Sequence, residues 1–293
     1  VHSARTQGGA GQSGNRKGEE SEFMHGTVMQ KPLSRGKPLS SVRRVKFPSF
    51  ASLCEGFAMS SVSTVFPALP VPVIPIVGSS QVYPVHRIYC VGRNYEDHAK
   101  EMGFTGREAP FFFMKPADAV VAAAPEQSIR LPYPSLTHDF HHEIELVVAI
   151  GSGGRDIPTA EAHRHIFGYA VGLDMTRRDL QNDMKKQGRP WSIGKGFDAS
   201  APLSAIVPAA EVSIPIESAD IWLKVNGELR QQGHIGQLIW NIAETIEHLS
   251  KAWTLQPGDL IFTGTPKGVG AVVPGDRLEG HVDGLPPLQV EVF

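Results

Sequence analysis

Two glutamates stand two positions apart at the start of a long apolar run. His142-Glu143-Ile144-Glu145 leads directly into residues 146–150, all of which are apolar. Side chains two apart on a strand point to the same side, so both carboxylates share one face. Two like charges beside a buried strand are costly unless a cation neutralises them. The alternative is that both glutamates pair with Arg or Lys on a solvated face.

A third carboxylate, Asp174, ends another apolar run over residues 171–173. Three carboxylates without a cysteine favour a hard cation. We therefore expect an all-oxygen site in which Glu143, Glu145 and Asp174 hold Mg²⁺, with Mn²⁺ or Ca²⁺ as alternatives.

An imidazole and a carboxylate lie close together in Asp97-His98-Ala99-Lys100-Glu101. On a helix, His98 and Glu101 are one turn apart and can touch. A carboxylate beside an imidazole orients it and raises its basicity, which suits a general base that acts on water. The alternative is a surface helix that carries charges of both signs.

Polar and basic side chains follow Asp174 on a stretch that we expect to be helical. Arg178 and Gln181 share one face of this helix, where they are placed to hold a substrate carboxylate. Lys195 lies between Gly194 and Gly196, where backbone can approach a ligand closely. Thr265 lies in the glycine-rich residues 263–270, which we expect to form a rigid loop that lends its hydroxyl to a small anion. Each of these features alone is also compatible with a solvated charge or a plain turn.

Two other kinds of site are disfavoured. The glycine-rich stretch is not a P-loop, because the order G-x-x-x-x-G-K-[ST] is absent and Lys267 precedes Gly268. Neither an H-E-x-x-H motif nor a cysteine supports a zinc site for the grouped histidines, which are His138, His141, His142, His163 and His165.

Short elements must position these residues. Hydrophobic patterns predict strands over 85–91, 144–150 and 168–173, and Asn226-Gly227 predicts a hairpin turn. Helices are predicted over 95–102, over 159–165 with a Thr159 cap, over 176–187 with Gly188 after its end, and over 238–253. Pro-Gly or Asp-Gly pairs at 257, 274 and 283 mark turns between β-rich runs. Strands outnumber helices without regular alternation, so we expect an α+β fold with a large mixed or antiparallel sheet system.

Composition sets broad limits on function. The chain has 293 residues, 41% hydrophobic and 20% charged, with a net charge of −2. This balance gives no overall attraction to nucleic acid or to anionic membranes, and we expect neither partner. No run of eighteen apolar residues predicts a membrane helix. Two cysteines cannot build a disulfide framework, which favours a reducing compartment.

The first part of the chain differs from the rest. Residues 3–15 are rich in Gly, Ser and Gln, and residues 23–54 carry Lys and Arg without any acid. The second composition is typical of an organelle transit peptide, whereas its prolines and the upstream glutamates favour an inert tail. We expect residues 1–80 to be a disordered or extended leader and residues 81–293 to be the catalytic domain.

The ordered series of motifs resembles the fumarylacetoacetate hydrolase superfamily over about Tyr83 to Phe293. The resemblance rests on Val91-Gly92-Arg93-Asn94-Tyr95 before His98 and Glu101, Phe113-Met114-Lys115-Pro116, His142-Glu143-x-Glu145, residues 172–181, Lys195-Gly196-Phe197-Asp198, and Pro257-Gly258-Asp259 through Thr263-Gly264-Thr265-Pro266. Within the superfamily, residues 111–120 and Gly188-Arg189-Pro190-Trp191 are most similar to fumarylpyruvate hydrolases, with acylpyruvases and oxaloacetate decarboxylases close behind.

The resemblance implies a mixed β-roll, usually a homodimer, with Mg²⁺ held by Glu143, Glu145 and Asp174. It implies that His98 and Glu101 activate water and that Lys195 lies by the reacting oxyanion. Substrate carboxylates would be held by Arg178, Gln181 and Thr265. The expected activity is hydrolysis of a C–C bond in a small anionic diketo acid, an acylpyruvate of aromatic catabolism, in the cytoplasm or mitochondria. The alternatives are oxaloacetate decarboxylation or tautomerisation, and a metal-stabilised binding protein that is not an enzyme.

Overall fold

The computed structural model describes residues 64–95 and 107–293. Residues 66–293 cluster as one unit by their contacts. The leader expected over residues 1–80 and the helix expected over 95–102 fall mostly outside the described residues. Among the described helices, none has the length and apolar character needed to cross a membrane.

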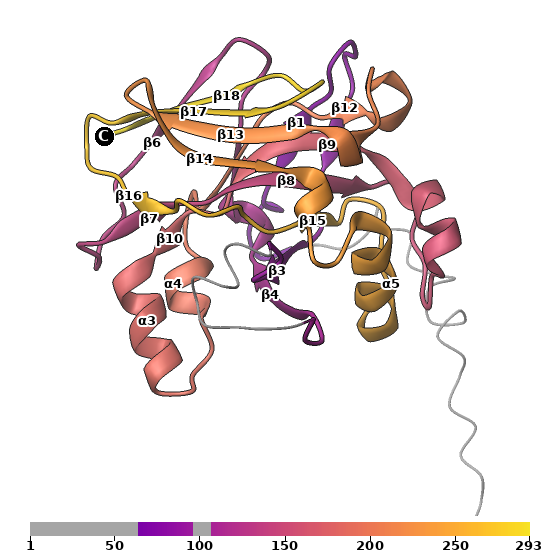
Figure 1. Ribbon diagram of the computed structural model, residues 1–293, viewed down its shortest axis with the longest axis horizontal. Coiled ribbons are helices and arrows are strands. Elements are labelled where there is room, and N and C mark those ends of the chain that lie inside the picture. Colours follow the sequence, from indigo (N-terminus) through magenta and orange to yellow (C-terminus); the bar gives the residue numbers. More distant parts are fainter. Residues whose placement is uncertain (1–63, 96–106) are drawn as a thin grey trace, which may run out of the picture. The chain divides into compact units, whose positions relative to one another are not determined.

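An eight-stranded mixed sheet forms the centre of the unit (Figure 1). Its pairing order is β4 (Phe111–Lys115), β3 (Ile88–Gly92), β15 (Leu260–Phe262), β8 (Ile144–Ile150), β9 (Ile166–Leu173), β11 (Ala201–Leu203) and β5 (Val120–Ala122), and β12 (Val207–Pro208) also pairs with β9. The β3–β15 and β5–β11 pairs are parallel, and the other pairs are antiparallel. This confirms the expected α+β class and the β-roll with a mixed sheet.

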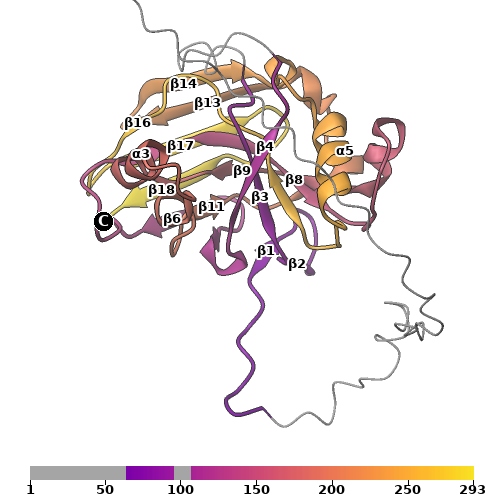
Figure 2. The same ribbon diagram turned by 90° about the horizontal axis from the view of Figure 1, so that it is seen from below.

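A five-stranded sheet packs on β8 and β9, as Figures 1 and 2 show. Its order is β14 (Glu228–His234), β13 (Asp220–Val225), β17 (Arg277–Val282), β18 (Leu288–Val292) and β6 (Ser128–Leu131). The described residues also form two small sheets. One contains β10 (Thr176–Arg177), β7 (Phe140–His142) and β16 (Gly270–Ala271), and the other contains β1 (Val73–Pro75) and β2 (Val82–Pro84).

In the part of the chain that the structure describes, three α-helices and five short 3₁₀ helices connect the strands. The α-helices are α3 (Arg178–Lys186), α4 (Ser192–Lys195) and α5 (Ile242–Ala252), and α3 and α5 lie on opposite sides of β3 and β4 in Figures 1 and 2. The 3₁₀ helices are η2 (Ala117–Ala119), η3 (Thr159–His165), η4 (Ala209–Glu211), η5 (Ile216–Ser218) and η6 (Ile235–Gln237).

Strand β8 is buried along its whole length because both of its faces are covered. Ile144, Leu146 and Val148 belong to the apolar cluster beneath the five-stranded sheet, whereas Val147 and Ala149 belong to a second cluster on the opposite face. Double coverage explains why this strand reads as a continuous apolar run rather than an alternating one. The two glutamates at its start are therefore placed inside the protein.

Several predicted boundaries need correction. The helix expected from residue 238 begins only at Ile242, because Asn241 forms a capping box with Glu244 that fixes its start. The helix expected from 176 begins at Arg178, since Thr176 and Arg177 pair as β10 with β7. The 159–165 segment is 3₁₀ rather than α-helical, and the side chain of Thr159 does not cap it.

Turn chemistry was predicted more accurately. Asn226 and Gly227 both have positive φ, at 52° and 83°, and join β13 to β14 as expected. Gly188 follows α3 with a φ of 62°, the left-handed conformation that ends many helices. The sequence therefore identified the points where the chain reverses better than the residues where helices start.

Candidate active site

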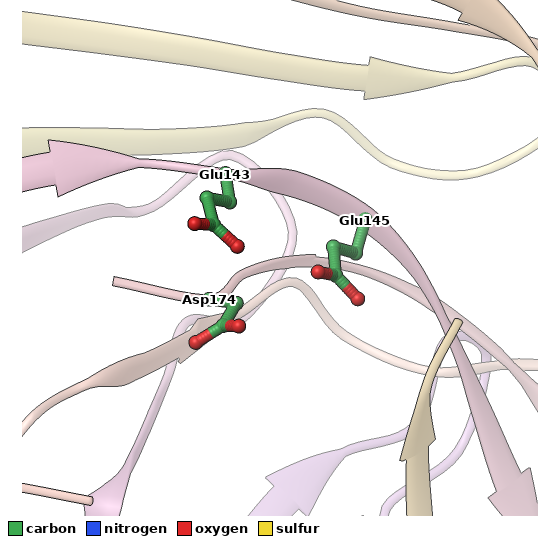
Figure 3. A group of neighbouring side chains, drawn as sticks. All are labelled: Glu143, Glu145 and Asp174. Atoms are coloured by element: carbon green, nitrogen blue, oxygen red, sulfur yellow. The ribbon is translucent and has the colours of Figure 1, made fainter. Parts of the chain in front are cut away.

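Three carboxylates meet where β8 begins and β9 ends. Antiparallel pairing of Ile144 with Leu173 places Asp174 opposite Glu143, and the Asp174 N–H donates to the Glu143 carbonyl at 2.9 Å. One carboxylate oxygen from each of Glu143, Glu145 and Asp174 lies within 4.8 Å of the others. Figure 3 shows the three side chains facing one another. The exposed fractions of Glu143, Glu145 and Asp174 are 6%, 2% and 1%, so these carboxylates do not lie on a solvated face.

Lys195 contacts two of these carboxylates directly. Its Nζ lies 2.8 Å from Glu143 Oε2 and 2.6 Å from Asp174 Oδ2, and it donates to Thr176 Oγ1 at 2.7 Å. Burial favours the neutral amine, but attraction to Asp174 and Glu143 outweighs it and raises the pKa of Lys195. The sequence predicted this lysine for the site from its place between two glycines, and the structure shows that it ends the short helix α4.

A second buried lysine, Lys115, was not predicted as a site residue. Its Nζ lies 2.8 Å from Asp174 Oδ1 and donates to the Met175 carbonyl at 3.1 Å and to the Lys195 carbonyl. The side chain is fully buried at the end of β4. A lysine directly after four apolar residues in Phe111-Phe112-Phe113-Met114 was the available signal, since a buried cation needs an anionic partner.

The two glutamates have opposite electrostatic environments. Burial disfavours the ionised form of Glu143, yet its ion pairs with Lys195 and Arg178 hold its pKa well below the usual range. Burial and then repulsion from Asp174 and Glu143 raise the pKa of Glu145 well above its usual value. The one hydrogen bond that Glu145 accepts within the described chain comes from the Gly264 N–H at 2.7 Å. Among the described residues, Glu145 is therefore the triad member that forms no ion pair.

This imbalance tests whether the triad fits a metal. Asp174 Oδ1 is also buried and accepts no hydrogen bond from the described residues, although Lys115 Nζ lies 2.8 Å away. Buried carboxylate oxygens that face a common space without sufficient donors leave an electrostatic deficit that a hard divalent cation satisfies. The donor set is all oxygen, as predicted, and it fits a divalent metal.

The predicted substrate residues line the same pocket as the triad. Its empty volume is about 410 Å³, and its polar wall includes Arg178, Gln181, Lys195 and Thr265. Arg178 donates to Gln181 Oε1 at 2.7 Å and also binds Glu143, a contact that the sequence did not indicate. Aromatic side chains form the other wall: Phe111, Phe113 and Trp191. The pocket therefore combines acidic, basic and apolar surfaces.

Gln231 connects the five-stranded sheet to the site and was missed by sequence reasoning. Its amide nitrogen donates to Thr265 Oγ1 at 2.8 Å and to the Pro266 carbonyl at 2.9 Å. Its amide oxygen lies 3.0 Å from the Ile144 nitrogen and 2.8 Å from His142 Nδ1. An amide oxygen can only accept a hydrogen bond, so His142 must carry its proton on Nδ1 to donate to it. Gln231 thus fixes both the strand between the two glutamates and the loop that carries Thr265.

The histidines do not form a zinc site. Among the described residues, the acidic triad is the one group of His, Cys, Asp and Glu whose ligand atoms converge. His141 instead lies between Asp139 Oδ1, at 2.7 Å, and the Arg178 Nε–H, at 3.3 Å. Burial lowers the pKa of His142 to about 4, so this side chain is neutral at physiological pH. Both histidines support neighbours of the triad through hydrogen bonds.

His98 and Glu101 lie outside the described residues, and their role stays a prediction. The structure does describe both flanks of their segment. On one side, Asn94 donates to the Trp240 carbonyl at 2.9 Å and accepts from the Trp240 N–H at 2.8 Å. On the other, the Arg107 guanidinium lies 4.0 Å from the Trp240 ring centroid and 2.6 Å from Glu244. Both flanks are therefore held by the start of α5.

With this geometry established, the similarities to known proteins identify the family. The fumarylacetoacetate hydrolase C-terminal family matches residues 87–293. This chain belongs to that family. The family consists of enzymes, and its hydrolase and isomerase members include the relatives that follow.

Among solved structures, fumarylpyruvate hydrolase from Pseudomonas aeruginosa, in complex with Mn²⁺ and pyruvate, is 56% identical with a TM-score of 0.77. The similarity covers 78% of this chain and 99% of that one. The 5-carboxymethyl-2-hydroxymuconate delta-isomerase from Mycobacterium smegmatis is 34% identical with a TM-score of 0.62, over 75% of this chain and 80% of that one. Among curated relatives, the mitochondrial oxaloacetate tautomerase FAHD1 of Rattus norvegicus is 47% identical over 70% of this chain and 90% of its own length.

Proposed function

We propose that the protein is a metal-dependent hydrolase that cleaves a C–C bond in an acylpyruvate, with fumarylpyruvate as the best-fitting substrate. The observation that carries the proposal is the meeting of a buried acidic triad and a row of cations in one pocket. The identity of 56% with a fumarylpyruvate hydrolase that binds Mn²⁺ and pyruvate supports this substrate class.

We propose Mg²⁺ as the resident metal, held by Glu143, Glu145 and Asp174, with Mn²⁺ as a functional substitute. When bound, the cation supplies Lewis acidity toward the oxygens of the 2-oxo acid. The protein contributes the buried set of carboxylate oxygens and the neighbouring ammonium of Lys195. All four side chains come from segments that are fixed by strand pairing or by a helix end.

The substrate residues then act on the two ends of the molecule. Arg178, Gln181 and Thr265 bind its carboxylates, and Lys195 stabilises negative charge on the reacting oxygen. Gln231 donates to Thr265, so the hydroxyl proton of Thr265 remains available for a substrate oxygen. The aromatic wall formed by Phe111, Phe113 and Trp191 accommodates the unsaturated carbon chain.

The chemical step requires a base for water, and we assign this role to His98, oriented by Glu101. His98 accepts a proton from water while the water oxygen bonds to the distal keto carbon. The bond between that carbon and the methylene breaks, and its electron pair passes to the 2-oxo acid fragment. A proton returns to the methylene carbon, which yields pyruvate and a carboxylic acid, fumarate in the case of fumarylpyruvate.

Oxaloacetate tautomerisation or decarboxylation is the second candidate activity, and the 47% identity with the rat oxaloacetate tautomerase favours it. The same pocket would bind oxaloacetate, which also carries a 2-oxo acid next to a methylene group. A substrate panel separates the two candidates. We expect faster turnover of fumarylpyruvate or acetylpyruvate than of oxaloacetate in Mg²⁺, measured by loss of diketo absorbance and by pyruvate formed. Much faster consumption of oxaloacetate would establish the second candidate instead.

Two assignments outside the active site complete the proposal. We place the protein in mitochondria or the cytoplasm, on the basis of the acid-free basic stretch over residues 23–54 and the mitochondrial names of curated relatives. We also propose that it is a homodimer. Microscopy of a fluorescent fusion to the full chain tests the compartment, and light scattering of the purified protein tests the assembly.

A further inference from the structure

Lys185 extends the polar wall of the pocket toward its outer end. Arg178, Gln181 and Lys185 follow one another at spacings of three and four on α3, and all three line the pocket. This spacing places them in a single stripe on one helix face. The next residue, Lys186, is instead exposed and lies 3.7 Å from Asp183 on the solvent side of the helix. Two adjacent lysines therefore have different surroundings.

The ammonium of Lys185 has no acidic partner within the described chain. Its Nζ lies 4.9 Å from the Trp191 ring centroid, and the ion pairs of the described residues do not include it. Burial and then repulsion from Arg178 and Lys195 lower the pKa of Lys185 to about 8. A partly buried cation beside two other cations is unfavourable unless an anion approaches it.

The inner cations of the pocket are already engaged. Arg178 binds Glu143, and Lys195 binds both Glu143 and Asp174. Gln181 Oε1 accepts a hydrogen bond from Arg178, and this bond holds the Gln181 side chain at the inner end of the stripe. Lys185 is thus the cation of the stripe that forms no ion pair with a carboxylate of the described chain. Trp191 lies beside it, so an anionic group there would be joined to the inner site along an aromatic surface.

We propose that Lys185 is a specificity-determining residue that binds the distal carboxylate of the acyl group. This inference rests on the proposed acylpyruvate hydrolysis, because it names the part of that substrate which Lys185 recognises. The inner site would hold the 2-oxo acid end, which all acylpyruvates share. Lys185 would distinguish dicarboxylic substrates such as fumarylpyruvate from monocarboxylic ones such as acetylpyruvate.

The test compares full-length wild type with Lys185→Met, which retains an unbranched side chain against Trp191. Values of kcat/KM are measured in saturating Mg²⁺ for fumarylpyruvate and acetylpyruvate. Lys185→Met should lose a charge-assisted hydrogen bond to fumarylpyruvate but not to acetylpyruvate. The kcat/KM ratio of fumarylpyruvate to acetylpyruvate should therefore fall by about 10- to 100-fold. The loss should lie mainly in KM, and Lys185→Arg should restore part of it. Lys186→Met is the matched control and should leave the ratio unchanged.

The outcomes separate this inference from the proposed function. If wild type cleaves both substrates but Lys185→Met lowers both equally, or neither, the role of Lys185 is wrong and the proposed function stands. If wild type cleaves no acylpyruvate, the proposed function fails and the assignment of Lys185 fails with it. Equal thermal unfolding midpoints of the two methionine variants exclude misfolding as the cause of a loss.

Discussion

The acidic and basic sides of the pocket are built in different ways. Glu145 and Asp174 are positioned by neighbouring strands of the central sheet, where backbone pairing fixes their separation. Arg178 and Lys185 extend from the single helix α3, and their ends are placed by side-chain contacts. Carboxylates whose positions are fixed by strand pairing suit a metal, because a metal needs a constant arrangement of ligands. Cations at the ends of long side chains suit an organic ligand of variable shape. The same division predicts where mutations abolish activity and where they change selectivity.

The largest effect should come from the acidic side. Glu143→Gln and Glu145→Gln should each reduce kcat/KM by about 10⁴-fold, because a Lewis acid contributes several kcal/mol to transition-state stabilisation.

The same two variants test whether the two glutamates differ in their contribution to stability. Urea unfolding in a chelator should show Glu143→Gln destabilised by about 3 kcal/mol, because its change leaves Arg178 without a buried anion. Glu145→Gln should leave stability nearly unchanged, and equal destabilisation of both variants would contradict this asymmetry.

Replacement of the proposed general base should lower activity without changing metal binding by the acidic triad. His98→Ala should lower kcat by about 10²- to 10⁴-fold through loss of proton transfer. Metal affinity, measured by calorimetric titration, should match that of wild type. Loss of metal binding would move His98 from the role of base to that of ligand. Glu101→Gln should lower the rate of hydrolysis more than the rate of oxaloacetate decarboxylation, because only hydrolysis needs an activated water. This result would support the water-activating role of His98 and Glu101.

An intermediate effect is expected at Gln231, which connects the acidic side to the Thr265 loop. Gln231→Met removes four hydrogen bonds, and a change in such a supporting residue typically costs about 10- to 100-fold in activity. The nitrogen NMR signals of His142 give a second measurement, because loss of the amide acceptor frees the imidazole from its Nδ1–H tautomer. The neighbouring Gln232 is exposed, so Gln232→Met is the control. Unchanged kinetics and an unchanged tautomer in Gln231→Met would make this connection unnecessary.

The smallest effect concerns pH on the basic side. Burial and then repulsion from Arg178 and Lys195 lower the pKa of Lys185 to about 8, against a smaller raising effect of Glu143. Lys185 is cationic below that pH and neutral above it. The kcat/KM ratio of fumarylpyruvate to acetylpyruvate should therefore fall about tenfold from pH 7 to pH 9. The ratio cancels groups that act on both substrates, and a flat profile would show that Lys185 does not bind the distal carboxylate.

The sequence was more informative about the acidic triad than about the side chains that support it. Alternation on a strand was enough to place Glu143 and Glu145 together, because the period of two is geometrically strict. Lys115 and Gln231 reach the site from β4 and β14, elements distant in the chain, and no local pattern encodes such contacts. The start of α5 was placed too early because the apolar spacing continues through Leu238, while the Asn241 cap decides the boundary.

The burial of β8 on both faces also affects how the chain folds. A slip of one residue between β8 and β9 would turn Leu146 into the pocket and force the Glu145 side chain into the opposite apolar cluster, which contains Ile144 and Val148. Burial of a carboxylate among these residues would cost several kcal/mol. A uniformly apolar strand would have no such penalty and would tolerate several registers. The residues that bind metal in the finished protein thus select the correct strand pairing while the sheet assembles.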